Sequence, residues 1–246
     1  MAYVEMTVVA GNTIEKKYYH CYKARDKNVE RAPRAPKTKE TSWQMEEVNR
    51  RNAEDKLRWI LNTNFREGDY HLVLNYKRKP GDPYREPEEM KADMQKFLRR
   101  MRAVFRRADL EFKYVYVFEI GEKGSRHIHI VMNKISLEAC RKCWEENGRV
   151  TCTPLDEHGD YRKLADYLMK YSDKTFRTVG RLMGKRYSCS RNMIEPRITR
   201  KIVKRANTYR RWVKPLPGYI VDVDTVREGV DAFGYCFFKY SMIRLE

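Results

Sequence analysis

Residues 114–133 read YVYVFEIGEKGSRHIHIVMN. Two runs rich in β-branched and aromatic residues flank a short segment that contains two glycines, which is typical of a β-hairpin. In such a hairpin Glu119 lies directly across from His127, and His129 follows two residues later on the same face of its strand. The stretch therefore predicts that one carboxylate and two imidazoles converge on one side of a β-sheet.

Imidazoles on an otherwise apolar strand usually have a polar or metal partner. The sharper interpretation is a divalent-metal site with ligands Glu119, His127 and His129 and with positions open for water or substrate. The alternative is a pair of histidines on a solvated sheet face. The opposed carboxylate of Glu119 favours the metal site.

The composition points to a polyanionic partner. The chain has 246 residues, with 52 Lys and Arg against 34 Asp and Glu, and a formal net charge of +18. Such an excess favours nucleic acid, while 12% aromatic and 41% hydrophobic residues exclude a disordered basic tail. We find neither a stretch of about 20 apolar residues nor a signal-peptide pattern, so we expect a cytoplasmic protein without a membrane partner.

The elements around the hairpin predict an α+β fold. A strand over 70–76 precedes a helix whose apolar face includes Met90, Phe97 and Phe105; after the hairpin come a helix capped by Ser136 and a strand from Arg149. The order β, α, β, β, α, β predicts a ferredoxin-like or RRM-like core with an open antiparallel sheet. Helices would cover one face and leave the other free for a ligand.

We expect three segments. Residues 1–65 would be an N-terminal extension of short strands, a linker and a helix. Residues 66–176 would be the core with the helix that follows it, and residues 177–246 a basic helical segment and a terminal strand pair. The C-x-x-C of Cys140 and Cys143 lies on an expected helix and lacks a second pair at zinc-site spacing, so we interpret both as structural thiols.

A second informative stretch follows the core. Residues 161–175 read YRKLADYLMKYSDKT. On a helix Tyr167, Lys170, Tyr171 and Lys174 lie on one stripe. A solvated Tyr/Lys face would explain this pattern, but a metal site just before it favours chemistry, in which a phenol attacks a phosphodiester and forms a covalent intermediate.

Taken in order, Glu119, HIH at 127–129 and the Y-x-x-K-Y-x-x-K of residues 167–174 resemble the HUH endonuclease superfamily. The likeness is strongest to rolling-circle replication initiators of the phage gene A type, with two tyrosines on one helix, and extends to plasmid Rep-like proteins. It covers about residues 70–175. The family nicks one DNA strand at an origin, forms a 5′-phosphotyrosine, leaves a 3′-hydroxyl for polymerase and later rejoins the ends.

The resemblance assigns roles and partners. Glu119, His127 and His129 match the metal ligands, and phosphate chemistry favours Mg²⁺ or Mn²⁺. Tyr167 matches the nucleophile and Tyr171 the second tyrosine, while Lys170 and Lys174 would stabilise phosphate charge. The expected partners are single-stranded DNA at a replication origin and a host helicase and polymerase in the cytoplasm of a bacterial host cell.

The segment 177–214 is the most basic part of the chain, with thirteen Lys or Arg against one acid. We expect a helix from Pro196 to Val213 that lies along a DNA backbone, although a solvated basic helix docked on the core is the alternative. The candidate nucleic-acid-binding residues are Arg181, Lys185, Arg186, Arg191, Arg197, Arg200, Lys201, Lys204 and Arg205.

Two alternatives to replication initiation stay open. A transposase or relaxase of the same superfamily would use the same chemistry on a different DNA. A non-catalytic, RRM-like protein would bind single-stranded nucleic acid through the same sheet face and basic segment, without a metal requirement.

Overall fold

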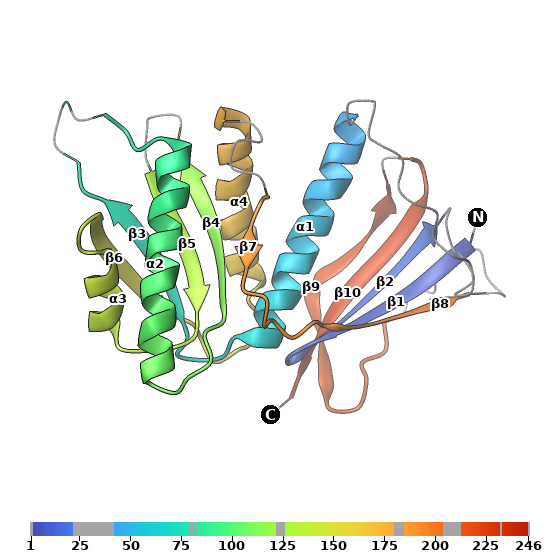
Figure 1. Ribbon diagram of the computed structural model, residues 1–246. Coiled ribbons are helices and arrows are strands. Elements are labelled where there is room, and N and C mark those ends of the chain that lie inside the picture. The colour runs from blue at the N-terminus through green and yellow to red at the C-terminus, as the bar shows by residue number, and fades with distance from the viewer. Residues whose placement is uncertain are drawn as a thin grey trace, which may run out of the picture. The chain divides into compact units, whose positions relative to one another are not determined.

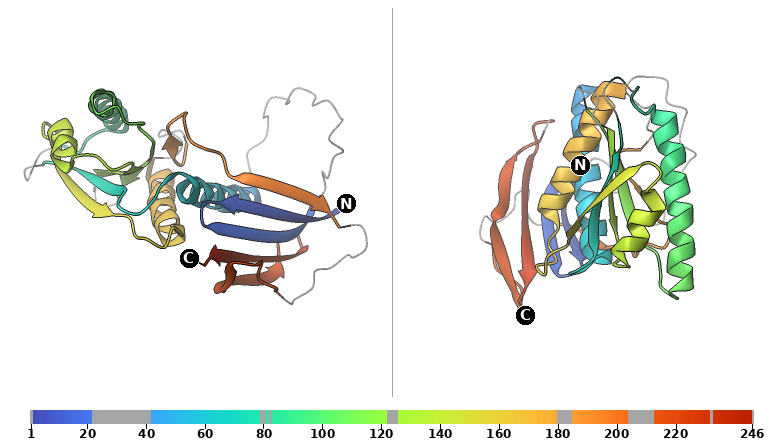
Figure 2. Two further views of the ribbon diagram at one scale, coloured as in Figure 1. Left: turned by 90° about the horizontal axis from the view of Figure 1, so that it is seen from below. Right: turned by 90° about the vertical axis from the view of Figure 1, so that its left-hand side faces the viewer.

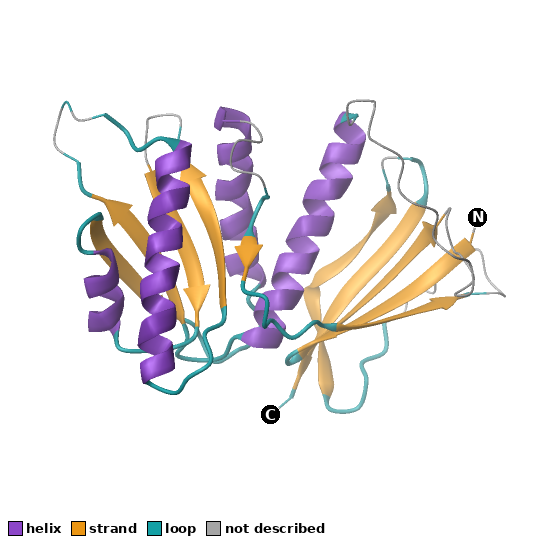
Figure 3. Cartoon of the chain, viewed as in Figure 1, coloured by secondary structure: helices purple, strands orange, loops and turns teal. Residues whose placement is uncertain are grey.

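The computed structural model describes residues 2–21, 42–78, 81, 83–121, 126–179, 185–203, 213–231 and 233–245. Within these ranges the fold is α+β, with four α-helices and two antiparallel sheets of five strands each (Figures 1 and 3). The chain divides into two compact units, which we call the central unit, Asn64–Ile194, and the terminal unit, Met1–Thr63 with Glu195–Glu246.

The central unit carries the stretch that opened the sequence analysis. Its strand order is β6-β3-β5-β4-β7. From the first strand to the sixth element the chain runs strand, helix, strand, strand, helix, strand. The elements are β3 (Tyr70–Tyr76), α2 (Pro87–Arg107), β4 (Tyr114–Ile120), β5 (Arg126–Met132), α3 (Leu137–Trp144), β6 (Gly148–Pro154), α4 (Arg162–Val179) and β7 (Ser188–Cys189).

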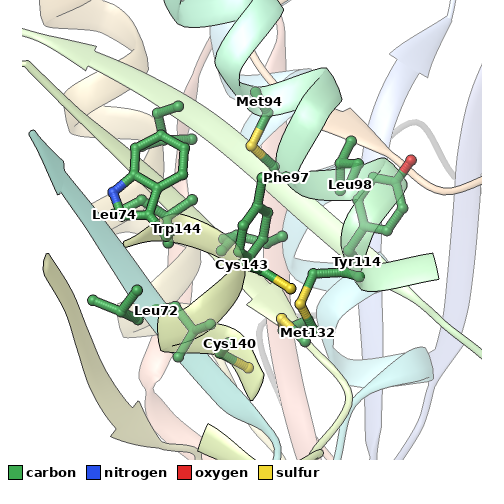
Figure 4. Close-up of a cluster of buried hydrophobic side chains, with 14 of the residues drawn as sticks. Leu72, Leu74, Met94, Phe97, Leu98, Tyr114, Met132, Cys140, Cys143 and Trp144 are labelled. Carbon is green, nitrogen blue, oxygen red and sulfur yellow. The ribbon is translucent and has the colours of Figure 1, made fainter. Parts of the chain in front are cut away.

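Local chemistry explains where α2 begins and which face it buries. Pro87 occupies the first turn, where its missing N–H costs nothing, and the Glu89 side chain accepts a 2.9 Å hydrogen bond from the Glu86 N–H. The predicted apolar face is confirmed, because its methionines and phenylalanines are buried with α3 against one face of the sheet (Figure 4). This core holds the sheet rigid from behind.

The short helix α3 also matches its prediction. The Ser136 hydroxyl accepts a 3.4 Å hydrogen bond from the Ala139 N–H and so caps the helix. Cys140 and Cys143 are thiols buried in the same core, as expected of structural residues. Gly148 opens β6 where only glycine fits, since a Cβ there would lie 2.0 Å from the Asn75 carbonyl oxygen.

The second face of this sheet is not free along its width, in contrast to the expectation. Helix α4 lies on the side opposite α2 (Figure 2, right). Its apolar residues Ala165, Leu168 and Met169 are buried, as are Val117 and Val131, which belong to the second face of the sheet by their register. An amphipathic helix must bury its apolar stripe, and this face supplies the nearest apolar surface.

The terminal unit is built from both ends of the chain. The sheet has the order β8-β1-β2-β10-β9. Its elements are β1 (Ala2–Ala10), β2 (Thr13–Cys21), α1 (Trp43–Asn64, of which the last residue is assigned to the central unit), β8 (Arg197–Ile202), β9 (Tyr219–Val230) and β10 (Cys236–Arg244). The predicted N-terminal strands, the helix that follows them and the terminal strand pair are confirmed.

A buried polar network joins α1 to this sheet. The Arg58 guanidinium donates to Glu15 at 2.6 Å and to Asp55 at 2.9 Å, and the Trp59 indole donates to Glu15 at 2.7 Å. The turn after β1 approaches the end of the helix so closely that a Cβ on Gly11 would lie 1.9 Å from the Asn62 carbonyl oxygen. Paired charges and a glycine contact therefore fix the helix on its sheet.

The helix expected from Pro196 is wrong where the structure describes it. Residues 197–202 form β8, which pairs antiparallel with β1. The edge of β1 offers unpaired backbone groups, and this pairing satisfies them better than an isolated basic helix would. Residues 204–212, the rest of the expected helix, lie outside the described residues. None of the described helices is long and apolar enough to cross a membrane.

Candidate active site

The polar residues of the hairpin share one sheet face because of the strand register. Glu119 of β4 is directly opposite His127 of β5, which confirms the predicted opposition. On its other side β5 pairs with β3, where Asn75 is opposite His127 and Val73 is opposite His129. By the alternation along β3, His71 belongs to the same face. Three histidines and one carboxylate therefore line one side of the central strands.

His129 is the centre of this group. Its Nε2 atom lies 3.0 Å from Glu119 Oε2, and its Nδ1 atom lies 3.2 Å from His71 Nε2. All three side chains are buried, with exposed fractions of 2% for His129, 7% for Glu119 and 8% for His71. Burial, and then the proximity of His129, lower the pKa of His71 to about 4. His71 is thus a neutral ring at physiological pH.

His127 stands apart from this hydrogen-bonded row. Its side chain is half-buried, and its Nδ1 atom is buried without a hydrogen-bond partner among the described residues. Burial lowers the pKa of His127, against the opposing effect of the nearby Glu119 carboxylate. A buried nitrogen with an unused lone pair or proton is costly, so this atom marks a place where a ligand would be stabilising.

Helix α4 brings both tyrosines to the histidines. The Tyr171 ring stacks on His129, with centroids 4.8 Å apart and an angle of 17° between the planes. The Tyr167 ring meets His129 edge-on at 5.6 Å, His71 edge-on at 5.8 Å and Tyr171 edge-on at 4.6 Å. A hydrogen bond with Tyr167, and then burial, raise the pKa of Tyr171 to about 12.

Two neighbouring residues of α4 hold the helix to β4 on either side of Glu119. The Thr175 hydroxyl donates to the Phe118 carbonyl oxygen at 2.8 Å and accepts from the Ile120 N–H at 2.9 Å. The Lys174 ammonium lies 3.8 Å from Glu119 Oε1. These contacts set the distance between the tyrosine helix and the carboxylate strand. Lys170, the other lysine of the predicted stripe, is exposed on α4.

The donor set suits a divalent cation in part. Among the described residues no group of three or more His, Cys, Asp and Glu side chains is arranged to hold a metal ion as it stands. Glu119, His127 and His129 nevertheless share one sheet face, and His127 contributes the buried, unpartnered Nδ1. The chemistry of these nitrogen and oxygen donors, together with that orphaned atom, fits a cation site that closes when the ion is present. Glu122, a reserve carboxylate in the turn, lies outside the described residues.

The basic candidates are divided between the two units. Lys185 and Arg191 are exposed on the central unit, while Arg186 forms an ion pair with Asp173 and packs over the Phe176 ring at 4.9 Å. Arg186 is therefore engaged in the support of α4. Three further candidates are exposed on β8 of the terminal unit, and three lie outside the described residues: respectively Arg197, Arg200 and Lys201, and Arg181, Lys204 and Arg205.

His71 is the site residue that sequence reasoning missed. It appeared only as a polar position in the alternating run YHLVLNY of residues 70–76. Its alternation with Leu72 and Leu74 did indicate the face opposite the core. The pairing of β3 with β5, which sets His71 beside His129, joins residues far apart in the sequence and carries no local signal.

Residues 69–176 match a protein-family model described as Replication-associated protein ORF2. The matched range begins just before β3 and ends within α4, so it contains His71, Glu119, His127, His129, Tyr167 and Tyr171. No curated protein and no solved structure matches the chain.

Proposed function

We propose that this chain nicks and rejoins single-stranded DNA with a tyrosine nucleophile and so initiates rolling-circle replication of a plasmid, phage or integrated element. The observation that carries the proposal is the packing of two phenols, Tyr167 and Tyr171, against an imidazole that is paired to the Glu119 carboxylate. The match of residues 69–176 to a replication-associated family supports the biological setting.

Tyr167 is the proposed first nucleophile because its side chain is accessible, with 40% of the residue exposed. Its Oη atom forms a bond to phosphorus, and the bond from phosphorus to the 3′ oxygen breaks. The phenolic proton passes to water, and the departing 3′ oxygen takes a proton from water to become a hydroxyl. The 5′ phosphate stays on the tyrosine, so the energy of the phosphodiester is kept for rejoining.

Glu119, His127 and His129 would hold Mg²⁺ or Mn²⁺, which when bound withdraws electron density from the scissile phosphate. A free phenol titrates near 10, so the nucleophile needs positive charge nearby to favour the phenolate. Lys174 lies at the site beside Glu119. Lys170 is exposed one turn from Tyr167, and we assign both ammonium groups to the stabilisation of negative charge on the nucleophile and phosphate.

The central unit supports a ferredoxin-like or RRM-like core for this activity. The strand order β6-β3-β5-β4, with α2 and α3 on one face, is the arrangement that such a core predicts. Exposed basic residues would contact the phosphates of single-stranded DNA at a replication origin, and a host helicase and polymerase would act with the chain in the bacterial cytoplasm. The proposed phosphate contacts are Lys185, Arg191, Arg197, Arg200 and Lys201.

The decisive experiment uses single-stranded oligonucleotides of random sequence and Mn²⁺. We expect a protein-DNA adduct that survives a denaturing gel and carries a 3′-terminal label but not a 5′-terminal label, because the downstream fragment keeps its phosphate on tyrosine. Adducts that carry only the 5′ label would contradict the proposed polarity. Binding without any adduct, and without dependence on Mn²⁺, would favour the non-catalytic binding protein instead.

Substitutions separate the nucleophile from the fold. Tyr167→Phe combined with Tyr171→Phe should abolish the adduct, whereas Tyr219→Phe, a control on β9, should leave it unchanged. Replacement of His127 and His129 by Ala should abolish cleavage and spare most of the salt-sensitive DNA binding, since that rests on the basic residues. Circle release from a double-stranded origin would then distinguish replication initiation from transposition.

A further inference from the structure

His71 is a buried histidine without a role in the steps described above. It lies on β3, and its ring stacks parallel to that of His129 with centroids 5.5 Å apart and 16° between the planes. Its Nε2 atom is 3.2 Å from His129 Nδ1, so the contact is a hydrogen bond between two ring nitrogens in a buried place. A hydrogen bond between imidazoles needs one donor and one acceptor, and the two rings therefore constrain each other's tautomers.

The contacts of His129 show what is at stake. Nε2 faces Glu119 Oε2 at 3.0 Å, and an ionised carboxylate only accepts, so Nε2 carries the proton in this arrangement. A cation bound at Nε2 needs the lone pair of that nitrogen. The proton of a neutral His129 must then be on Nδ1, and a buried Nδ1–H requires an acceptor. His71 Nε2 is the atom placed to accept it.

We propose that His71 is a positioning residue that accepts the Nδ1 proton of His129 and thereby frees His129 Nε2 to coordinate a divalent cation beside Glu119. The inference rests on the proposed function, since it concerns the same cation site. It adds a residue to the support of that site from a strand that the hairpin alone does not supply. Metal-binding histidines commonly have such a partner on their other nitrogen, and the partner sets ring orientation and basicity.

The exchange balances in protons. Before the ion binds, each ring carries one proton, on Nε2 of His129 and on Nε2 of His71. With the ion bound, each ring again carries one proton, now on Nδ1 of both. The His71 Nε2 proton is transferred to His129 Nδ1, while the His129 Nε2 proton leaves to water and His71 Nδ1 gains one from water. The hydrogen bond between the rings is kept and reverses its direction.

Packing alone is the competing explanation, because His71 also meets the Tyr167 ring edge-on at 5.8 Å. Two substitutions separate the roles. His71→Phe keeps an aromatic ring of similar size and removes the nitrogen, whereas His71→Gln loses the ring and keeps an amide oxygen that can accept a proton near the position of Nε2. If packing were the whole role, Phe would be the milder change; if the acceptor matters, Gln would be.

The experiment measures binding of Mn²⁺ alone to the full chain by electron paramagnetic resonance, with a thermal melt of each variant to establish folding. We expect His71→Phe to weaken Mn²⁺ binding by about 10- to 100-fold and His71→Gln to restore most of it. Nitrogen-15 spectra of the wild type with saturating Mg²⁺ should show the His129 proton on Nδ1. Equal Mn²⁺ affinity of His71→Phe and wild type would overturn the inference, as would a His129 that keeps its proton on Nε2 in Mg²⁺.

The readouts keep this inference distinct from the proposed function. A wild type that binds Mn²⁺ normally, forms the tyrosine adduct and shows no effect of His71→Phe would leave strand cleavage intact and reject the role of His71. A wild type that binds Mn²⁺ in a His71-dependent way but forms no adduct would support His71 and reject the tyrosine chemistry. A wild type that binds no Mn²⁺ would reject His71 as a support of a cation ligand, whatever the DNA result.

Discussion

Tyr167 and Tyr171 lie one helical turn apart in different surroundings. Tyr167 is 40% exposed and meets His129 edge-on, whereas Tyr171 is half-buried and stacked face to face on the same ring. The pKa of Tyr171 is raised to about 12, so its ionisation near neutral pH costs more than that of an ordinary phenol. Both accessibility and charge therefore favour Tyr167 as the residue that attacks first.

Single substitutions test that order. Tyr167→Phe should abolish the adduct formed in the first turnover, while Tyr171→Phe should keep it, because an exposed phenol is still present. Peptide mapping by mass spectrometry after digestion of the DNA identifies the modified residue. Wild-type protein modified first on Tyr171 would contradict the assignment, and Tyr219→Phe serves as the unchanged control.

The cysteines of α3 make a second prediction at this scale. Burial raises the pKa of Cys140 to about 12 and also raises that of Cys143, whereas Cys236 is exposed. The thiolate is the reactive form, so the raised pKa keeps Cys140 protonated at every pH below about 12. We expect iodoacetamide at pH near 8 to modify Cys236 and to spare Cys140 and Cys143 until denaturant is added. Equal rates at Cys140 and Cys236 in the native protein would show that the core is open.

At the scale of elements, the site depends on how α4 is fastened to the sheet. Thr175 satisfies two backbone groups of β4, Phe118 C=O and Ile120 N–H, that flank Glu119. On the other side of the helix, the Ser172 hydroxyl donates to the Arg186 carbonyl oxygen at 2.6 Å. The tyrosines are therefore placed by hydrogen bonds to a neighbouring strand as well as by the apolar stripe of the helix.

Thr175→Val tests this fastening with almost no change of shape. The substitution leaves two buried backbone groups without their partner, which should cost about 1–3 kcal/mol of unfolding free energy. The adduct rate should fall as well, because α4 is less well held against Glu119. Thr178→Val is the matched control on the same helix, since Thr178 is exposed and its hydroxyl donates only to the Lys174 carbonyl oxygen. A Thr175 variant as stable and active as the Thr178 variant would show that the apolar stripe alone places the helix.

At the scale of the whole chain, the first and last segments form one sheet. Strand β2 pairs with β10, and β1 pairs with β8, so neither end of the chain builds its sheet alone. The central unit, by contrast, is continuous in sequence and contains its own core and every residue of the candidate site. The unit that carries the chemistry is thus independent of the chain ends in its packing.

Fragments test this division. Residues 64–194 should fold alone, and their single tryptophan, the buried Trp144, should report one cooperative transition in urea. Residues 1–63 should stay unfolded, because three of the five strands of their sheet are absent. Far-ultraviolet circular dichroism and tryptophan fluorescence check both fragments. A folded 1–63 fragment, or an unfolded 64–194 fragment, would contradict the division.

Sequence alone determined the features that depend on neighbours along the chain. The period of apolar residues gave the buried face of α2, the capping residues located α3, and the hairpin pattern placed Glu119 opposite His127, because facing within an element follows from its own geometry. Tertiary structure decided which strands lie side by side. It set His71 beside His129, laid α4 over the second face and turned residues 197–202 into a strand on β1. Pairing between distant segments satisfies backbone groups wherever an edge is offered, and local sequence does not specify that edge.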